Sequence, residues 1–268
     1  MWPRQDCSPR PEKGQFLAPT SNPPPPWHPL GHLPRAAQSL LDVGCNEGAI
    51  LGDAYGLGVR TLRGIEINRH ILDTARQRLA HISDVEIFHG SADHIPLSDG
   101  SVDVVTCLEV LEHVPAELRR DVISEVSRVL VPHGRFIITV PANGLFSFLD
   151  PANIRFRLPT LFGFITALVG GRGREAGYEG EVHGVVWHHH FSLVELGRLF
   201  DQSFELEHLR WRGVLLVPLC GILEFPFYRR NRTDHPLFKL VRWINHWEHS
   251  VDLGRFLGYN MLVVLRKR

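Results

Sequence analysis

A turn with two glycines and a carboxylate further along the chain are the residues best suited to bind a ligand. The segment LLDVGCNEG carries Asp42, Gly44 and Gly48 where an apolar run ends. Glycine lets the backbone approach a ligand closely, and the unpaired N–H groups at the start of a following helix can meet it. Glu66 follows 22 residues after Gly44, where a carboxylate can accept both hydroxyls of a ribose. We therefore expect a ligand that contains adenosine.

The same turn has two other interpretations. It could be a tight turn selected for packing, or the phosphate loop of a dinucleotide site. A dinucleotide fingerprint requires GxGxxG, but Asn46 and Ala49 stand after Gly44 where further glycines would be needed. The backbone would then approach a pyrophosphate poorly, so a dehydrogenase is disfavoured.

A second cluster, in the sequence CLEVLEHVP, consists of Glu109, Glu112 and His113. Histidine suits general-base work near neutral pH because its ordinary pKa is about 6.5. On a helical turn the three side chains would share one face, where they could instead bind a divalent ion. A third alternative is that His113 only packs in the loop. We predict that His113 acts on the group to be modified and that no metal is bound.

Three consecutive histidines, His188 to His190, precede the apolar segment FSLVEL. We predict a catalytic role on the acceptor side for His189. Ser192 is predicted to cap the helix that begins there, with Glu195 at the capping-box position.

From Ser39 onward, short apolar strands alternate with helical segments, as in a parallel sheet that is covered by helices on both faces. We expect strands at 40–43, 62–67, 85–88, 102–107, 135–140, 204–211 and 259–265. Helices are expected from about Gly48, from Asn68, which would cap its helix, to about Ala80, and from Leu193 to Phe200. Another is expected from Ala116 to Leu130, where Pro132 and Gly134 would end it. The fold class is therefore a doubly wound α/β sheet.

Proline is concentrated in residues 1–35, which we interpret as a flexible or polyproline leader. Residues 36–268 are then one domain, with long, aromatic-rich and irregular insertions at 142–190 and 214–255. Basic and acidic residues number 29 each, so no net charge attracts duplex nucleic acid. The chain begins without the apolar stretch of a signal peptide, and its four cysteines lack CxxC spacing, so we expect a cytoplasmic protein.

The motifs, taken in order, resemble those of the class I S-adenosylmethionine-dependent methyltransferases, in particular the small-molecule type 11 subgroup related to ubiquinone-biosynthesis O-methyltransferases. LLDVGCNEG resembles their motif I, GIEIN the ribose-binding motif II, HGSADHIPL motif III and VDVVTCLEVLEHV motif IV. FELEHLRWRG and GYNMLVVLRKR look like their C-terminal antiparallel hairpin. The resemblance implies a Rossmann-like sheet of seven strands, mostly parallel, with S-adenosyl-L-methionine as cofactor.

The resemblance also implies which residues would contact the cofactor. The motif I loop would meet the methionine part, motif II the ribose, motifs II and III the adenine, and motif IV would close the pocket. The implied residues are Asp42, Gly44, Cys45, Gly48, Glu66, Ile67, Ser91, Ala92, Leu108 and Glu109. Two positions depart from the family pattern. Asn46 replaces a second glycine, which asparagine can do because it tolerates left-handed dihedrals, and Ser91 replaces an aspartate.

We thus expect a methyltransferase that acts on a hydroxyl of a small-molecule, glycan or lipid-linked acceptor. The apolar runs FRLPTLFGFITALVGG and GVLLVPLCGILEFPFYRR favour an amphiphilic acceptor, and a peripheral contact with a membrane is a further expectation. One alternative is a module that binds the cofactor without catalysis. Another is a metal-dependent RNA 2′-O-methyltransferase, because a branch of the family that methylates small RNAs uses ExxEH and a downstream histidine, here His189, for a metal.

Overall fold

A computed structural model describes residues 24–150, 160, 189–200, 202–216, 219–220, 223, 235–252, 254 and 257–268. The chain divides into two compact units. The sheet unit comprises residues 10–140, 191–209 and 262–268, and the insertion unit comprises residues 1–9, 141–190 and 210–261.

The strands form one sheet whose order is β3-β2-β1-β4-β5-β7-β6. They are β1 (Ser39–Val43), β2 (Thr61–Glu66), β3 (Val85–His89), β4 (Val102–Leu108), β5 (Leu130–Pro141), β6 (Phe204–Arg212) and β7 (Asn260–Lys267). Strands β1 to β5 pair in parallel. The N–H of Tyr259, before β7, donates to the carbonyl oxygen of Gly213, after β6. The N–H of Arg268, after β7, donates to the carbonyl oxygen of Ser203, before β6, so β7 runs antiparallel to β6. The predicted seven-stranded, mostly parallel α/β fold is confirmed.

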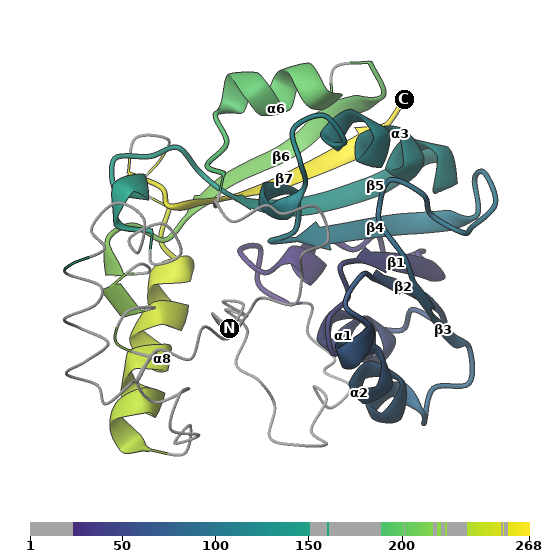
Figure 1. Cartoon of the computed structure of the whole chain (residues 1–268), viewed down its shortest axis with the longest axis horizontal. Coiled ribbons are helices and arrows are strands. Elements are labelled where there is room, and N and C mark those ends of the chain that lie inside the picture. The colour runs from purple at the N-terminus through teal and green to yellow at the C-terminus, as the bar shows by residue number, and fades with distance from the viewer. Residues whose placement is uncertain are drawn as a thin grey trace. The chain divides into compact units, whose positions relative to one another are not determined.

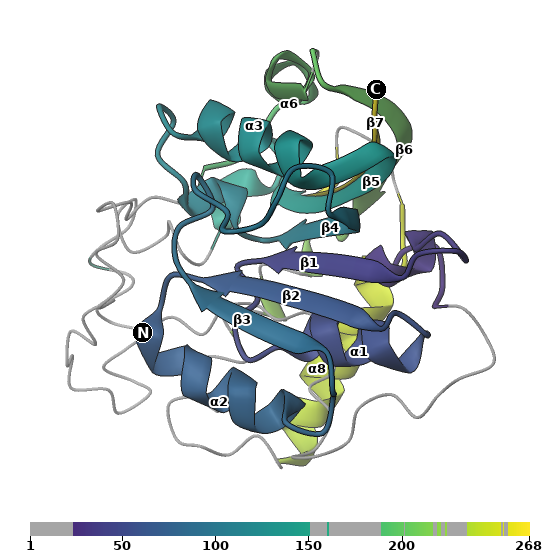
Figure 2. The ribbon, with the colours of Figure 1, turned by 90° about the vertical axis from the view of Figure 1, so that its right-hand side faces the viewer.

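Helices cover both faces of the sheet. In the sheet unit, α1 (Ala49–Gly56) and α2 (Arg69–Leu79) lie on one face, while α3 (Arg119–Val129) and α6 (Leu193–Phe200) lie on the other (Figures 1 and 2). Two predicted caps are confirmed. The Asn68 side chain accepts a hydrogen bond from the N–H of His70 at 3.1 Å, and Ser192 Oγ accepts one from the N–H of Glu195 at 3.2 Å.

The core lies between the sheet and these helices. On the face of α1 and α2, Leu40 of β1 packs in a cluster with Leu51 of α1 and Leu72 of α2. On the other face, the Phe136 ring meets the rings of Phe200 and Phe204, with centroids 6.1 and 5.6 Å apart. Each fully buried side chain of this size contributes about 1.5–3 kcal/mol, so the core fixes the strands whose ends carry the predicted site.

The junction between α3 and β5 differs from the prediction. The helix was expected to run to Leu130 and to end because of Pro132 and Gly134, but α3 ends at Val129 and Leu130 already pairs with Val102 of β4. A register shift follows, and the next residue in register, Val104, faces Arg135. Pro132 therefore lies inside an irregularity of β5. The missing N–H of proline costs no strand hydrogen bond there, because the regular pairing is interrupted.

The end of the predicted leader is packed, which the proline content did not indicate. Residues 24–35 include the short helix η1 (Pro29–His32), and Leu30 is 1% exposed in the core cluster of the sheet unit. The guanidinium of Arg135 donates to the carbonyl oxygen of His32 at 2.6 Å. The buried side chains of Pro29 and Leu30 and the carbonyl oxygen of His32 thus hold this segment. Residues 1–23 lie outside the described residues.

The insertion unit contains a helix where an irregular segment was predicted. Within residues 214–255, α8 (Pro236–His249) begins with a proline at its first turn, and the side chain of His235 accepts from the N–H of Leu237 at 3.2 Å. Phe238 and Val241 are buried one turn apart. The prediction that 214–255 is irregular is wrong for this part, because turn-spaced apolar residues and a capped start stabilise the helix.

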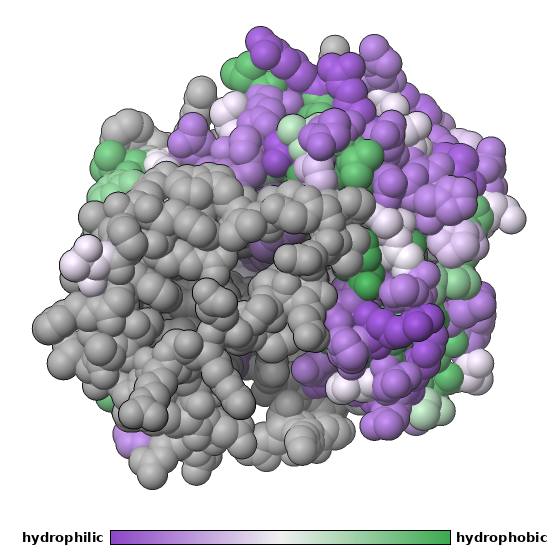
Figure 3. Space-filling model, viewed as in Figure 1, coloured by the Kyte–Doolittle hydropathy of each residue, from purple (hydrophilic) through white to green (hydrophobic). Residues whose placement is uncertain are grey.

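The other insertion, 142–190, is described only at its two ends. It carries the short helix η3 (Ser147–Leu149), and His190 Nε2 lies 2.7 Å from Asp150 Oδ2. None of the helices that the structure describes is long and apolar enough to cross a bilayer. In the space-filling view, the coloured surface is largely hydrophilic with isolated apolar residues (Figure 3).

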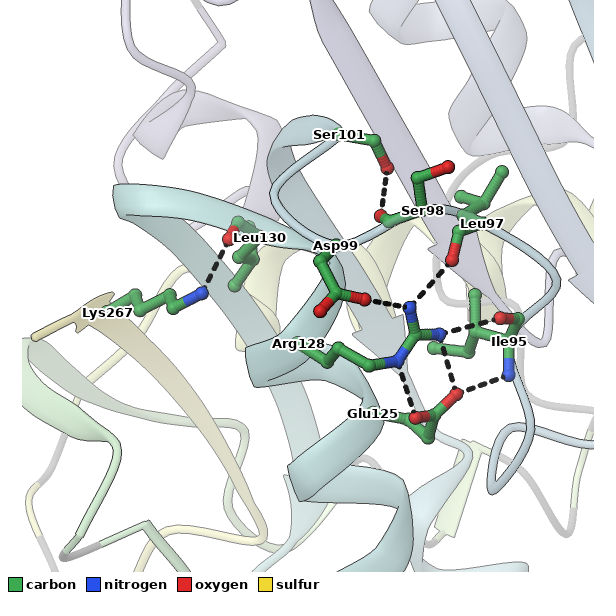
Figure 4. Close-up of polar contacts among 9 residues, drawn as sticks. All are labelled: Ile95, Leu97, Ser98, Asp99, Ser101, Glu125, Arg128, Leu130 and Lys267. Carbon is green, nitrogen blue, oxygen red and sulfur yellow. Dashed lines mark hydrogen bonds and ion pairs between the residues drawn. The ribbon is translucent and has the colours of Figure 1, made fainter.

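A polar network holds the loop between β3 and β4 against α3 (Figure 4). Arg128 donates to the carboxylate of Glu125 at 2.7 Å, to Asp99 at 2.8 Å and to the carbonyl oxygens of Ile95 and Leu97. The second Glu125 oxygen accepts from the N–H of Ile95 at 2.8 Å. Hydrogen bonds from Arg128 lower the pKa of Glu125 to about 2. The network therefore fixes the loop that follows the predicted adenine-binding residues.

We expect Glu125→Gln to destabilise the fold at neutral pH. Because the folded-state pKa of about 2 lies below the ordinary value of 4.5, the charged carboxylate stabilises the fold above about pH 4.5, and this contribution disappears as the pH falls to about 2. After allowance for solvent screening, the loss at pH 7 should be about 1–2 kcal/mol. Urea unfolding at a series of pH values measures it.

The matched control is Glu86→Gln, an exposed carboxylate 3.7 Å from Arg63. It should change the free energy of unfolding by less than about 0.5 kcal/mol. Equal dependence of unfolding on pH in the wild type and Glu125→Gln would contradict the assigned role of the network.

Candidate functional site

The loops that follow β1, β2 and β3 meet at the carboxyl ends of these strands in the sheet unit. The N–H groups of Gly44 and Cys45 both donate to the carbonyl oxygen of Ile65, at 2.8 and 3.1 Å. The N–H of Gly90 donates to the carbonyl oxygen of Glu66 at 3.1 Å. Three of the predicted motifs, distant in sequence, therefore lie side by side.

The loop after β1 uses left-handed backbone conformations at three positions. Gly44, Asn46 and Gly48 have φ angles of 71°, 49° and 76°, and the expectation that asparagine tolerates this region is confirmed. A Cβ atom on Gly44 would lie 2.5 Å from Val110, and one on Gly48 would lie 2.6 Å from Leu79. Glycine is therefore required by the packing of the loop, and the same compact turn exposes backbone to a ligand.

Glu66 is the acid at the end of β2, and its carboxylate is tied to the backbone. Oε2 accepts from the N–H of Asn46 and Oε1 from the N–H of Asn68, both at 2.9 Å. The residue is 1% exposed. Each carboxylate oxygen has two lone pairs, so it can accept a hydrogen bond from a ribose hydroxyl in addition to the one from the backbone N–H. The two asparagine N–H groups were not predicted, because backbone donors leave no signal in side-chain types.

Asp42 lies beneath the loop and pairs with the neighbouring strand. Its Oδ1 accepts from Thr106 Oγ1 at 2.7 Å, and both residues are buried. Asp42 and Thr106 are register partners on the neighbouring strands β1 and β4. The alternation of side chains along each strand could have indicated this pairing. Nearby, burial raises the pKa of the Cys107 thiol well above its ordinary value, and the charges of Glu112, Asp42 and Glu109 raise it further. Acidic groups thus surround this end of β4.

The loop after β4 does not form the helical face that was predicted for Glu109, Glu112 and His113. Glu109 has a φ angle of 56° and precedes the turn η2 (Leu111–His113), so it is not one helical turn from the other two. The Glu112 side chain is fully buried, whereas that of His113 is 30% exposed, and His113 Nε2 lies 3.8 Å from Glu112 Oε1. The imidazole is therefore the member of this pair that can meet an acceptor.

The metal alternative concerns Glu109, Glu112, His113 and His189. Among the residues that the structure describes, no group of three or more His, Cys, Asp or Glu side chains is arranged to hold a metal ion. His189 belongs to the insertion unit, so its predicted catalytic role stays a prediction.

Arg119 was not predicted and ties the loop after His113 to the start of α6. Its Nε donates to the carbonyl oxygen of Val114 at 3.0 Å, and its guanidinium donates to Glu195 at 3.3 Å. The guanidinium also lies over the Phe191 ring, 4.9 Å from the centroid. Burial lowers the pKa of Arg119. An arginine at a helix start is typical of the protein surface, so this contact could not be predicted from the sequence.

The remaining predicted residues lie on the same loops. Ile67 follows β2, and its carbonyl oxygen is 3.2 Å from His89 Nε2. Ser91 and Ala92 follow Gly90 and are half-buried, and Leu108 is the last residue of β4. All the predicted cofactor-binding residues therefore lie in or beside the loops at one edge of the sheet, although their contacts with a cofactor stay predictions.

Comparisons with known proteins match the segment that builds this edge. Residues 41–138 match the family model described as "Methyltransferase domain". A ubiquinone biosynthesis O-methyltransferase from Thiobacillus denitrificans is 35% identical over 104 residues, which are 38% of this chain and 43% of that protein. A demethylmenaquinone methyltransferase from Bacillus licheniformis is 32% identical over 111 residues, 40% of this chain and 46% of that protein. The chain thus spans less than half the length of these curated relatives.

Solved structures share the fold over most of the chain. A SAM-dependent methyltransferase from Methanosarcina mazei is 18% identical with a TM-score of 0.53, over 88% of this chain and 94% of that one. A geranyl diphosphate C-methyltransferase from Streptomyces coelicolor is 14% identical with a TM-score of 0.51, over 86% and 71%. At this identity the likeness shows the fold alone.

The sheet order, its reversed last strand and the glycine loop with its strand-end acid define a Rossmann-like domain of the kind that binds an adenosine-containing cofactor. With the family match, residues 41–138 belong to the class I S-adenosylmethionine-dependent methyltransferases of the type 11 group. The cofactor of this family is S-adenosyl-L-methionine. The residues present fit it, because the compact turn after β1 and the anchored carboxylate of Glu66 lie on adjacent strands.

Replacing Glu66 with alanine should weaken binding of S-adenosylmethionine and of its demethylated product. Loss of the ribose hydrogen bonds should cost about 1–3 kcal/mol of binding free energy. Isothermal titration calorimetry measures this, with thermal melting to show that the variant is folded. Glu86→Ala, on the neighbouring strand β3, is the control and should bind as the wild type does. An unchanged affinity in a folded Glu66→Ala protein would place the ribose elsewhere.

Proposed function

We propose that this chain transfers a methyl group from S-adenosylmethionine to a hydroxyl oxygen of a small-molecule, glycan or lipid-linked acceptor. The observation that carries the proposal is the position of His113, a partly exposed imidazole on the turn after β4. This turn directly follows Val110, whose side chain occupies the space beside Gly44 in the cofactor loop. A proton acceptor therefore lies on the turn that begins one residue after this contact with the loop that would hold the methionine part.

The bound cofactor supplies an electrophilic methyl group on a sulfonium. The chain must orient a hydroxyl and take its proton, which can supply about 10²- to 10⁴-fold in rate. The neutral imidazole of His113 would accept the proton of this hydroxyl. The buried carboxylate of Glu112, 3.8 Å away, stabilises the imidazolium that results.

The positioning of this imidazole depends on Arg119. Its hydrogen bond to Val114, the residue after His113, and its ion pair with Glu195 hold the loop to α6. Because a displacement by about 1 Å can cost about 10²-fold in rate, a loop fixed on both sides suits a transfer that needs alignment.

The acceptor class rests on the insertions and on the relatives. The matched relatives are named for methylation in ubiquinone biosynthesis and of demethylmenaquinone, and these names support a small, amphiphilic acceptor. The apolar runs of the two insertions support the same size and character. We further propose that His189, which precedes the capped start of α6, contributes to the acceptor side.

Transfer of labelled methyl from the cofactor into fractionated cell extract, followed by mass identification of the product, tests the proposal. A methylated hydroxyl of a small or lipid-linked molecule would support it. Tight cofactor binding without any labelled product would indicate an inactive binding module. Labelled product that ribonuclease degrades, with turnover lost in EDTA and restored by magnesium or manganese, would indicate the RNA alternative.

His113→Ala should lower kcat by about 10²- to 10⁴-fold with little change in affinity for the cofactor. The wild-type rate should rise with pH as the imidazole loses its proton, because only the neutral form accepts one, and the variant should lack this rise. Steady-state kinetics on the identified acceptor measures both. His81→Ala, an exposed histidine beyond α2, is the control. Normal kcat with the same pH profile in His113→Ala would show that the histidine is structural.

A further inference from the structure

Helix α8 of the insertion unit exposes large apolar side chains along one face. Leu240, Trp243 and Trp247 are 51%, 64% and 55% exposed, and Leu237, at the first turn, is 50% exposed. Their spacing of three, three and four residues places them along one side of the helix. Tryptophan is costly to leave in water, so two of them on one exposed stripe form an interaction surface rather than scattered apolar residues.

The opposite face already anchors α8 to its own unit. Phe238, Val241, Asn245 and Glu248 are buried. The carboxylate of Glu248 accepts the N–H of Leu216 at 2.8 Å. The helix therefore keeps its position without the exposed stripe, whose side chains are available to a partner.

The charges of α8 select the kind of partner. Glu248 is its only acidic residue, and it is buried. Lys239 is exposed, Arg242 is half-exposed, and on the helix both lie on the same flank of the stripe. The outward side of α8 therefore combines apolar and basic groups without an acid, which is complementary to an anionic surface with an apolar interior.

We propose that the stripe Leu237, Leu240, Trp243 and Trp247, with Lys239 beside it, docks α8 into the interface of a membrane that contains anionic lipids. Tryptophan favours this interface because one end of the ring is apolar and the other carries a polar N–H. Lysine can extend its stem over the apolar layer while its ammonium meets the headgroups. A second copy of this chain fits less well, because its own α8 offers no exposed acidic side chain to meet Lys239.

The test is flotation of the full chain with vesicles, and it needs no methyl transfer. The wild type should bind vesicles of phosphatidylcholine with phosphatidylglycerol, and bind vesicles of phosphatidylcholine alone much less. The double variant Trp243→Ser, Trp247→Ser should lose at least about tenfold in partition coefficient, since the buried rings supply most of the apolar area. Lys239→Gln should lose about fivefold on anionic vesicles only.

Leu206→Ser, a 55% exposed leucine on β6 of the sheet unit, is the matched control and should bind vesicles as the wild type does. Circular dichroism and cofactor binding should be unchanged in all variants, which separates docking from the proposed methyl transfer. Equal binding of the wild type and the double variant would overturn the proposal. So would a wild-type dimer, seen by sedimentation velocity, that binds no vesicles and becomes monomeric in the double variant.

Discussion

The carboxylate of Glu66 and the two backbone N–H groups that it binds are the constraint on which the candidate site depends. One N–H belongs to the loop after β1 and the other to the first residue after Ile67, where α2 is capped. A buried carboxylate is costly unless donors surround it. The donors are available only when β1 and β2 are paired and both loops are in place. The same bonds therefore satisfy a buried charge and set the shape of the ligand site.

Most of the fold could be predicted from the sequence because its strands are short, apolar and separated by clear caps. Asn68 and Ser192 carry side-chain acceptors at helix starts, and such local chemistry is visible in one segment at a time. The helix α8 was missed because aromatic residues on both of its faces hide the helical period. The beginning of β5 was missed because Pro132 and Gly134 are as typical of an irregular strand as of a helix end.

The candidate site was predictable in its residues but less so in its geometry. Motif order indicated which loops meet, but the left-handed Glu109 separates the ExxEH residues that a helix would have aligned. Contacts of Arg119 with Val114 and Glu195 join segments that are far apart in sequence, and no local pattern reports them. Long-range contacts of this kind follow from packing, which depends on the whole fold.

The position of β7 in the sheet has a consequence for synthesis on the ribosome. It lies between β5 and β6, although it follows both in the chain. Leu262 and Val264 of β7 also share the core cluster that holds Leu30, near the start of the described chain. Until β7 emerges, β6 has no neighbour in the sheet and Leu30 lacks part of its packing. A nascent chain stalled before Asn260 would thus expose an open sheet edge, a surface of the kind that chaperones cover.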